Sequence, residues 1–388
     1  LVGGRLSTHC PGPPRRSWVA AAAARMASRE SATRLGWPVE PEVRTCNGSA
    51  VVAWCQSVSC AWISAALPET GQRLLTRPTL PTSADVWAPC HNQRVATAAQ
   101  WIEGARPRTL PAAIAPVLAG TGIAVFEGEP VWWKAALALL VALFLQIGVN
   151  YANDYSDGIR GTDQDRVGPM RLVGSGAASA KSVKLAALAT LGLAGVFGLA
   201  LAATTAWWLV AVGAVCILAA WYYTGGSKPY GYLGLGEVMV FIFFGLVAVL
   251  GTTYVQTLTF ELGSLFAAIG IGSLACAILV ANNLRDIPTD ITAGKRTLAV
   301  VLGDDRTRQL FVLLQRGAML MLIGVAVTTS RWSLLALVAV VPMVLSNLRV
   351  QRGANGPELI PVLKLAGITE LLYGLGIFVG CALAVVLS

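Results

Sequence analysis

Charged residues and histidine are both scarce in this sequence. Of 388 residues, 13% are charged and 55% are hydrophobic, and the mean hydropathy is +0.64. A soluble domain needs fewer apolar residues to fill its core, so the composition indicates a polytopic membrane protein. Both histidines, His9 and His91, precede Val95. Their absence from Val95 onward argues against histidine-ligated haem, histidine-bound zinc and a catalytic triad with imidazole, which leaves carboxylates to carry the chemistry.

Recognisable cysteine patterns and nucleic-acid-binding motifs are also absent from the sequence. Five of the eight cysteines lie before residue 96, without a CxxC pair or zinc spacing: Cys10, Cys46, Cys55, Cys60 and Cys90. The net charge is +9, yet no stretch resembles a nucleic-acid-binding module. In membrane proteins basic residues more often hold loops on the cytoplasmic side, so we expect the lipid bilayer, and no nucleic acid, as a partner.

Residues 1–95 differ in composition from the rest of the chain. They mix Pro, Gly, Arg and Ser with scattered Trp, and none of their apolar runs is long enough to span a membrane. The first 28 residues weakly resemble a signal peptide or a transit peptide, although Arg25 cuts the apolar run short. We interpret residues 1–95 as a poorly ordered or misassigned leader, with an internal start as an alternative, and residues 96–388 as a membrane domain.

Nine apolar segments follow Trp101, each near the twenty or so residues that a helix needs to cross about 30 Å of hydrocarbon. They lie at about 110–126, 131–153, 183–203, 206–224, 233–255, 263–284, 309–329, 331–348 and 365–387. The sequence therefore predicts an all-α fold, a bundle of nine transmembrane helices around a central cavity.

The basic residues between these segments predict the orientation of the chain. If the N-terminal side is cytoplasmic, only Lys134 and Arg331 fall on the opposite side. Sixteen fall on the cytoplasmic side: Arg106, Arg108, Arg160, Arg166, Arg171, Lys181, Lys184, Lys228, Arg285, Lys295, Arg296, Arg306, Arg308, Arg349, Arg352 and Lys364. This asymmetry predicts a multi-pass protein of the cell membrane with its polar loops toward the cytoplasm.

Two polar clusters stand at the cytoplasmic ends of the second and sixth segments. "NYANDYSDGIRGTD" (150–163) and "NNLRDIPTDITAGKRT" (282–297) both repeat Asn and Asp at steps of four, which places these side chains along one side of a helix. The repeats are Asn150 with Asp154, Asn153 with Asp157, and Asn282 with Asp286 and Asp290. A lone acid at a helix end usually belongs to a hydrated loop. Two clusters of closely spaced carboxylates at one depth repel one another and are best explained by a bound cation that neutralises them. Oxygen ligands without His or Cys favour Mg²⁺, which shares its coordination with substrate phosphates.

Several cations lie near these clusters in the sequence. They are Arg160, Arg166, Arg171, Lys228 and Lys295. Each of them alone is equally well explained as a residue that sets the membrane topology, but together they resemble a clamp for diphosphate. Glycine-rich turns at 174–176 and 224–237 accompany them, although glycine is common in loops.

Four motifs resemble the UbiA-type intramembrane aromatic prenyltransferases, over about residues 98–388. They are "GARPRTLPAAIAPVLAGTG", "NYANDYSDGIRGTDQDRVGPMRLVGSG", "YTGGSKPYGYLGLGEVMVFIFFGLVAVLGT" and "NNLRDIPTDITAGKRTLAVVLG". The resemblance implies that two aspartate-rich motifs hold Mg²⁺ on a polyprenyl diphosphate: Asn153, Asp154 and Asp157 in the first, and Asn283, Asp286 and Asp290 in the second. Where many members have another Asp four residues after Asp157, this chain has Gly161.

The same resemblance implies a reaction. The diphosphate leaves, an allylic carbocation forms, and an aromatic acceptor is prenylated; in the branch that this chain resembles, the acceptor is 1,4-dihydroxy-2-naphthoate, which loses CO₂ and gives demethylmenaquinone. The loop after the fourth segment contributes Tyr222, Tyr223 and Lys228, and a tyrosine ring there could stabilise the cation, although interfacial aromatics are common in membrane proteins.

Other interpretations stay open at this point. A cation-coupled transporter would also carry intramembrane acids, but transport sites usually lie near the bilayer midplane. Within the family, the acceptor could instead be 4-hydroxybenzoate, homogentisate, or a chlorophyll or haem precursor. Arg106 and Arg108 are candidates for an acceptor carboxylate, Asp163 and Asp165 are candidates for assisting Mg²⁺, and Glu237 is a suspected site residue without a known partner. The sequence indicates neither prenyl length nor oligomeric state.

Overall fold

The computed structural model describes residues 44–46, 49–51, 96–161 and 170–387. The chain divides into two units, Leu1–Val86 and Trp87–Ser388. The described part of the first unit is an antiparallel pair of strands, β1 (Arg44–Cys46) and β2 (Ser49–Val51), with Arg44 opposite Val51. The sequence pattern did not predict these strands. The rest of the expected leader lies outside the described residues.

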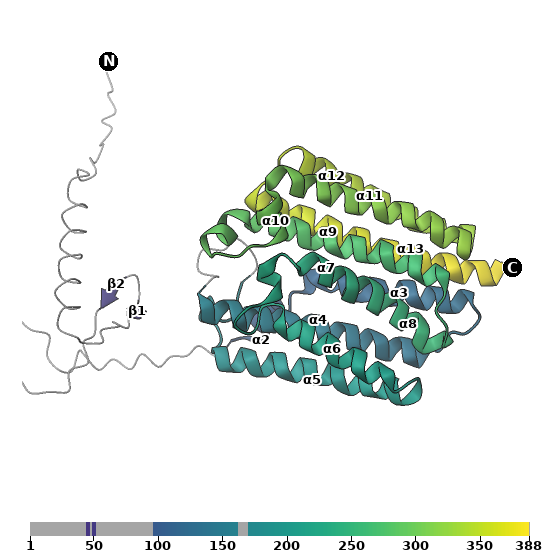
Figure 1. Cartoon of the computed structure of the whole chain (residues 1–388), viewed down its shortest axis with the longest axis horizontal. Helices are drawn as coiled ribbons and strands as arrows, with labels where there is room; N and C mark the ends of the chain where they lie inside the picture. The colour runs from purple at the N-terminus through teal and green to yellow at the C-terminus, as the bar shows by residue number, and fades with distance from the viewer. Residues whose placement is uncertain (1–43, 47–48, 52–95, 162–169, 388) are drawn as a thin grey trace, which may run out of the picture. The chain divides into compact units, whose positions relative to one another are not determined.

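The described regular structure of the second unit is entirely helical (Figure 1). In chain order the helices are α2 (Ala98–Gly104), η1 (Pro107–Thr109), α3 (Pro111–Phe126), α4 (Trp132–Arg160), α5 (Ala180–Thr204), α6 (Trp208–Tyr222), η2 (Tyr230–Leu233), α7 (Gly236–Val240), η3 (Phe241–Val247), α8 (Ala248–Thr257), α9 (Leu262–Thr292), α10 (Leu298–Leu302), α11 (Asp304–Thr328), η4 (Arg331–Ala339), α12 (Val340–Gln351), η5 (Gly356–Glu358) and α13 (Leu359–Leu387). The long helices run side by side, with α5 and α6 at one edge and α11 and α12 at the other (Figure 1).

Seven of the described helical stretches are long and apolar enough to cross a membrane. An eighth is the pair Ala98–Thr109 and Pro111–Phe126, which bends by 50°. All nine predicted segments are helical, but α6 has only 15 residues and a length of about 22 Å, less than the hydrocarbon thickness. The chain is therefore a multi-pass membrane protein with seven or eight described helices of full spanning length. The nine predicted apolar segments are all helical, but nine membrane spans are not confirmed.

Helix α9 forms the centre of the bundle because it is buried along most of its length. Its residues Ile271 and Leu274 belong to the main core cluster, together with Leu322 of α11 and Tyr373 of α13. The Tyr373 hydroxyl donates a hydrogen bond of 2.9 Å to the Ala318 carbonyl, so the polar atom of this fully buried ring is satisfied. This packing holds the polar end of α9 in a fixed place.

The π-helical stretch η3 interrupts the span that runs from α7 to α8. Its Gly245 approaches α9 so closely that a Cβ would lie 2.6 Å from the Gly272 Cα. Such π-helical turns are rare and often mark functional sites, because the wider turn redirects side chains. Here the redirected face contributes Phe243, Phe244 and Val247 to the cavity described below.

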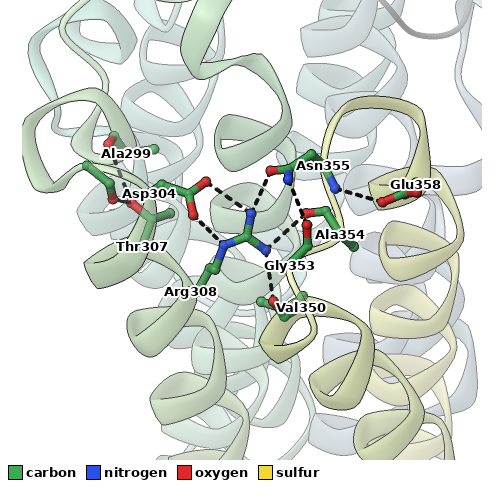
Figure 2. Close-up of polar contacts among 10 residues, drawn as sticks. Ala299, Asp304, Thr307, Arg308, Val350, Gly353, Ala354, Asn355 and Glu358 are labelled. Carbon is green, nitrogen blue, oxygen red and sulfur yellow. Dashed lines mark hydrogen bonds and ion pairs between the residues drawn. The ribbon is translucent and has the colours of Figure 1, made fainter.

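Arg308 ties the start of α11 to the end of α12 (Figure 2). Its Nη1 donates to the Val350 and Ala354 carbonyls at 2.8 and 2.9 Å, and its Nη2 donates to Asn355 Oδ1 at 2.7 Å. Asp304, one turn earlier, pairs with the same guanidinium. These carbonyls lie at the end of α12 and in the turn after it, so one side chain connects the turn that leads into α13 to α11.

Replacing this guanidinium should destabilise the α12–α13 turn. We expect Arg308→Ala to lower the free energy of unfolding by about 1.5–3 kcal/mol, the usual range for hydrogen bonds to a charged group. Thermal unfolding in detergent measures this loss. Arg306→Ala, at an exposed position two residues earlier, is the control and should leave the melting temperature unchanged. Equal melting temperatures for both variants would contradict the role given to Arg308.

Candidate active site

A cavity of about 720 Å³ lies between the two polar clusters. Segments of α3, α4, α5, α6, η3, α8 and α9 line it, together with the first turns of α13. On α5, α6 and α8 its wall includes Gly198, Gly213 and Gly251, where a Cβ would meet no atom within 4 Å. The missing side chains widen the apolar part of the cavity.

One face of α4 lines the cavity from Ala138 to Asp157. The lining residues follow steps of three and four: Ala138, Val141, Ala142, Leu145, Gln146, Val149, Asn150, Asn153 and Asp157. Residues at these steps share one side of an α-helix. The lining therefore changes along α4 from apolar side chains to amides and a carboxylate at the C-terminal end.

The C-terminal half of α9 shows the same change. Ala275, Ile278 and Leu279 are followed by a polar set on the cavity wall: Asn282, Asn283, Arg285, Asp286 and Asp290. Arg285 holds Asp286 with two hydrogen bonds, from Nε at 2.7 Å and from Nη2 at 2.9 Å. The Thr297 hydroxyl lies 3.4 Å from Asp290 Oδ2. Both acids are buried, and a charged or polar group contacts each of them.

Asp157 connects α4 to three other segments. Lys295 Nζ, just after α9, lies 3.5 Å from its Oδ1, and Arg171 Nη2, in the α4–α5 loop, lies 3.7 Å from its Oδ2. The Tyr232 hydroxyl of η2 donates to Oδ1, and Lys295 Nζ lies 4.6 Å from the centre of the Tyr232 ring. Two cations and a hydroxyl thus compensate a carboxylate that is only 3% exposed.

The loop after α6 is held by the end of α4. Arg160 donates to the carbonyls of Thr224 and Gly226, and its guanidinium lies 5.4 Å from the centre of the Tyr232 ring. The Thr224 hydroxyl donates to Asn153 Oδ1 at 2.8 Å. These contacts place the glycine-rich turn beside the first polar cluster.

Asp154 binds the backbone of the α4–α5 loop. Its Oδ2 accepts the Leu172 amide at 2.7 Å and its Oδ1 accepts the Val173 amide at 3.0 Å. With 1% of its surface exposed, it does not belong to the described lining of the cavity. The carboxylate therefore fixes the α4–α5 loop directly after Arg171.

Comparison with known proteins identifies the family. The model of the UbiA prenyltransferase family matches residues 113–358. The chain belongs to this family. Its relatives include the 1,4-dihydroxy-2-naphthoate octaprenyltransferases of Mycobacterium tuberculosis, 56% identical over 285 residues (73% of this chain, 97% of the relative), and of Escherichia coli, 38% identical over 299 residues (74% and 97%). The predicted family is confirmed.

Solved structures of UbiA homologues share the fold. One, from Archaeoglobus fulgidus, is bound to DMAPP and Mg²⁺ and matches with a TM-score of 0.53 at 16% identity, covering 72% of this chain and 99% of the homologue. The apo homologue from Aeropyrum pernix K1 matches with a TM-score of 0.56 at 15% identity, covering 69% and 97%.

In this UbiA-family chain, most of the predicted site residues share one cavity. Its lining includes Asn150, Asn153, Asp157, Arg171, Tyr223, Asn283, Asp286, Asp290 and Lys295. Four other predicted and described residues are not part of that lining: Asp154, Arg160, Tyr222 and Lys228. Tyr222, the last residue of α6, and Lys228, in the turn after α6, are both exposed. Arg166, Asp163 and Asp165 lie outside the described residues.

The prediction missed several residues of the cavity wall, including Tyr230, Tyr232, Gln146 and Lys364. Gln146 could have been found, because it lies four residues before Asn150 on the face of α4 that carries the first cluster. Tyr230 gave no comparable signal. Its hydroxyl donates to the Ala219 carbonyl at 2.7 Å, and burial raises its pKa, so the phenol stays neutral at physiological pH.

The surroundings of Glu237 and of the acidic clusters can be compared directly with the predictions. Glu237, whose partner was not predicted, accepts a hydrogen bond of 2.9 Å from Asn283 Nδ2 and is buried behind the second cluster. No three Asp, Glu, His or Cys side chains converge as a preformed metal site in the described part of the chain. Asp157, Asp286 and Asp290 instead contact basic side chains or hydroxyl groups, and Asp154 accepts two backbone amides.

The contacts of Asp154 predict how its loss acts. In Asp154→Asn only one side-chain oxygen remains, so one of the two buried amides loses its acceptor, a cost of about 1–3 kcal/mol. We expect the amides of Leu172 and Val173 to exchange with deuterium about tenfold faster or more, without any added metal. Hydrogen-exchange mass spectrometry of the 170–178 segment measures this, with the exposed Asp305→Asn as control. Unchanged exchange would show that the carboxylate does not hold the loop.

Proposed function

We propose that the protein transfers a polyprenyl group from a polyprenyl diphosphate to 1,4-dihydroxy-2-naphthoate, releasing diphosphate and CO₂ and forming demethylmenaquinol in menaquinone synthesis. The match to this chain covers 97% of the relative from Mycobacterium tuberculosis and 97% of the relative from Escherichia coli. Both relatives are 1,4-dihydroxy-2-naphthoate octaprenyltransferases. The observation that carries the proposal is the single cavity whose wall joins both acidic clusters and their cations to a long apolar surface.

Mg²⁺ is the cofactor in this proposal, and the donor set fits it. Mg²⁺ uses few protein carboxylates, keeps several waters and shares its other positions with phosphate oxygens, so it does not require a preformed cluster of three acids. Asn153 and Asp157 would hold it from α4, and Asp286 and Asp290 from α9. When bound, Mg²⁺ neutralises charge on the departing diphosphate. We assign Asp154 to positioning of the Arg171 loop, because both of its oxygens accept backbone amides.

The basic side chains of the cavity bind the diphosphate in this account. Arg171 and Lys295 already lie beside Asp157. They would stabilise the negative charge that develops on the bridging oxygen of the diphosphate as the allylic C–O bond breaks. The apolar wall takes the polyprenyl chain and keeps water from the carbocation. The Tyr223 ring lines the same cavity and packs edge-on against the Tyr230 ring, with 5.5 Å between the ring centroids, which fixes an aromatic surface for the cation.

Bond changes at the acceptor need no base at the reacting carbon. The ring carbon that bears the carboxylate bonds to the allylic carbon, and CO₂ then leaves. The electrons of the broken C–C bond return to the ring and restore its aromaticity. The cavity residues therefore have to bind and orient two anionic substrates, rather than remove a ring proton.

The proposal includes nine membrane spans in the cell membrane, with the site toward the cytoplasm. The short helices α3 and α6 would complete the nine, since each occupies one of the predicted apolar segments. The excess of Lys and Arg in the loops on the side of the two acidic clusters supports the orientation.

Turnover by the purified full chain tests the function. With Mg²⁺, a polyprenyl diphosphate and 1,4-dihydroxy-2-naphthoate under anaerobic conditions, we expect release of diphosphate and formation of prenylated naphthoquinol, and complete loss of both in excess chelator. 4-Hydroxybenzoate and homogentisate serve as competing acceptors. Activity that persists in chelator would contradict the Mg²⁺ site, and preference for another acceptor would contradict the assigned substrate.

A further inference from the structure

We propose that Lys364 of α13 binds the carboxylate of the aromatic acceptor at the mouth of the cavity, on the side where α13 packs against η1 and Arg108. This inference rests on the proposed function, which requires an acceptor with a carboxylate, and it adds a residue that lies beyond the matched family segment of residues 113–358. Lys364, with Ile360 and Leu363, brings the start of α13 into the cavity wall.

Five of the six basic residues of the cavity wall, all except Arg106, fall into two groups. Arg171, Arg285 and Lys295 each contact a carboxylate of the acidic clusters. By contrast, Lys364 and Arg108 form no ion pair with any described residue, although both are exposed on the cavity wall. The first group can serve the metal and the diphosphate, and the second is available for another anion.

Lys364 and Arg108 come from neighbouring segments. Gly367, one turn after Lys364, lies against η1, where a Cβ on it would be 3.7 Å from the Arg108 carbonyl oxygen. The start of α13 is held in place by the Asn355–Glu358 capping box and by the Arg308 contacts at Ala354 and Asn355 (Figure 2). The backbone that carries Lys364 is therefore fixed before any ligand binds, which lowers the entropic cost of binding.

Three uncharged polar side chains, Thr109, Gln146 and Asn150, form the wall between η1 and α4. The Thr109 hydroxyl donates to the Arg106 carbonyl at 2.9 Å, so it can only accept from Gln146 Nε2 at 2.8 Å and Asn150 Nδ2 at 3.0 Å. This arrangement fixes the Gln146 amide and leaves its Oε1 without a hydrogen-bond donor among the described residues. A hydroxylated aromatic acid matches such a wall better than an isoprenoid chain does.

Charge removal at Lys364 gives the test. In Lys364→Gln we expect the KM for 1,4-dihydroxy-2-naphthoate to rise about fivefold to tenfold, as for loss of one charged contact near solvent, while kcat and the KM for the polyprenyl diphosphate stay within twofold. Lys364→Glu should raise the acceptor KM further. Lys364→Arg keeps the positive charge and should leave the acceptor KM near that of the unmodified protein. Added salt should raise the acceptor KM of the unmodified protein more than that of Lys364→Gln.

Equilibrium binding separates this inference from the catalytic proposal. By calorimetry, the Kd of 1-hydroxy-2-naphthoate should rise in Lys364→Gln, whereas the Kd of uncharged 1-naphthol should not. Lys181→Gln, on the exposed start of α5 and outside the described cavity lining, is the matched control. If the unmodified protein lacks turnover, the proposed function fails. If Lys364→Gln behaves as Lys181→Gln does in binding, or raises the KM for the diphosphate instead, Lys364 does not bind the acceptor.

Discussion

Compensation of one buried carboxylate, Asp157, organises the polar end of this protein. A charged oxygen at the end of a membrane helix is stable only if cations or hydroxyl groups surround it. Arg171, Tyr232 and Lys295 supply them, and each comes from a different segment of the chain. The α4–α5 loop, the turn after α6 and the end of α9 therefore converge on α4, and this convergence forms the polar wall of the cavity.

The same compensation prepares the site for its substrates. Arg171 and Lys295 are already positioned by a carboxylate. In the proposed function, a metal-bound diphosphate would therefore exchange charged partners without leaving any charge alone in a medium of low dielectric constant. Arg160 binds the backbone of the turn after α6, and Asp154 binds the backbone of the α4–α5 loop. In the proposed function, the apolar remainder of the cavity would hold the long tail of the donor, and the basic mouth at η1 and α13 would bind the acidic acceptor.

Sequence periodicity predicted the helices and the shared depth of the clusters, because steps of four residues and apolar length are local properties. It also predicted that Asn153, Asp157, Asp286 and Asp290 line one chamber. It did not predict that Asp154 turns toward the backbone of Leu172 and Val173, since both neighbouring acids fit the same motif and only the loop path separates their roles. Tyr232 and Lys364 were missed for a related reason: their place at the site depends on how distant helices pack.

Binding of Mn²⁺ as a stand-in for Mg²⁺ tests the central claim most directly, with electron paramagnetic resonance as the readout and an unreactive polyprenyl thiodiphosphate as the ligand. If α4 and α9 share one ion and diphosphate site, Mn²⁺ binds in the presence of the analogue, and both Asp157→Asn and Asp286→Asn weaken that binding at least tenfold. Unchanged Mn²⁺ affinity in either variant would show that the two helices do not hold a common site.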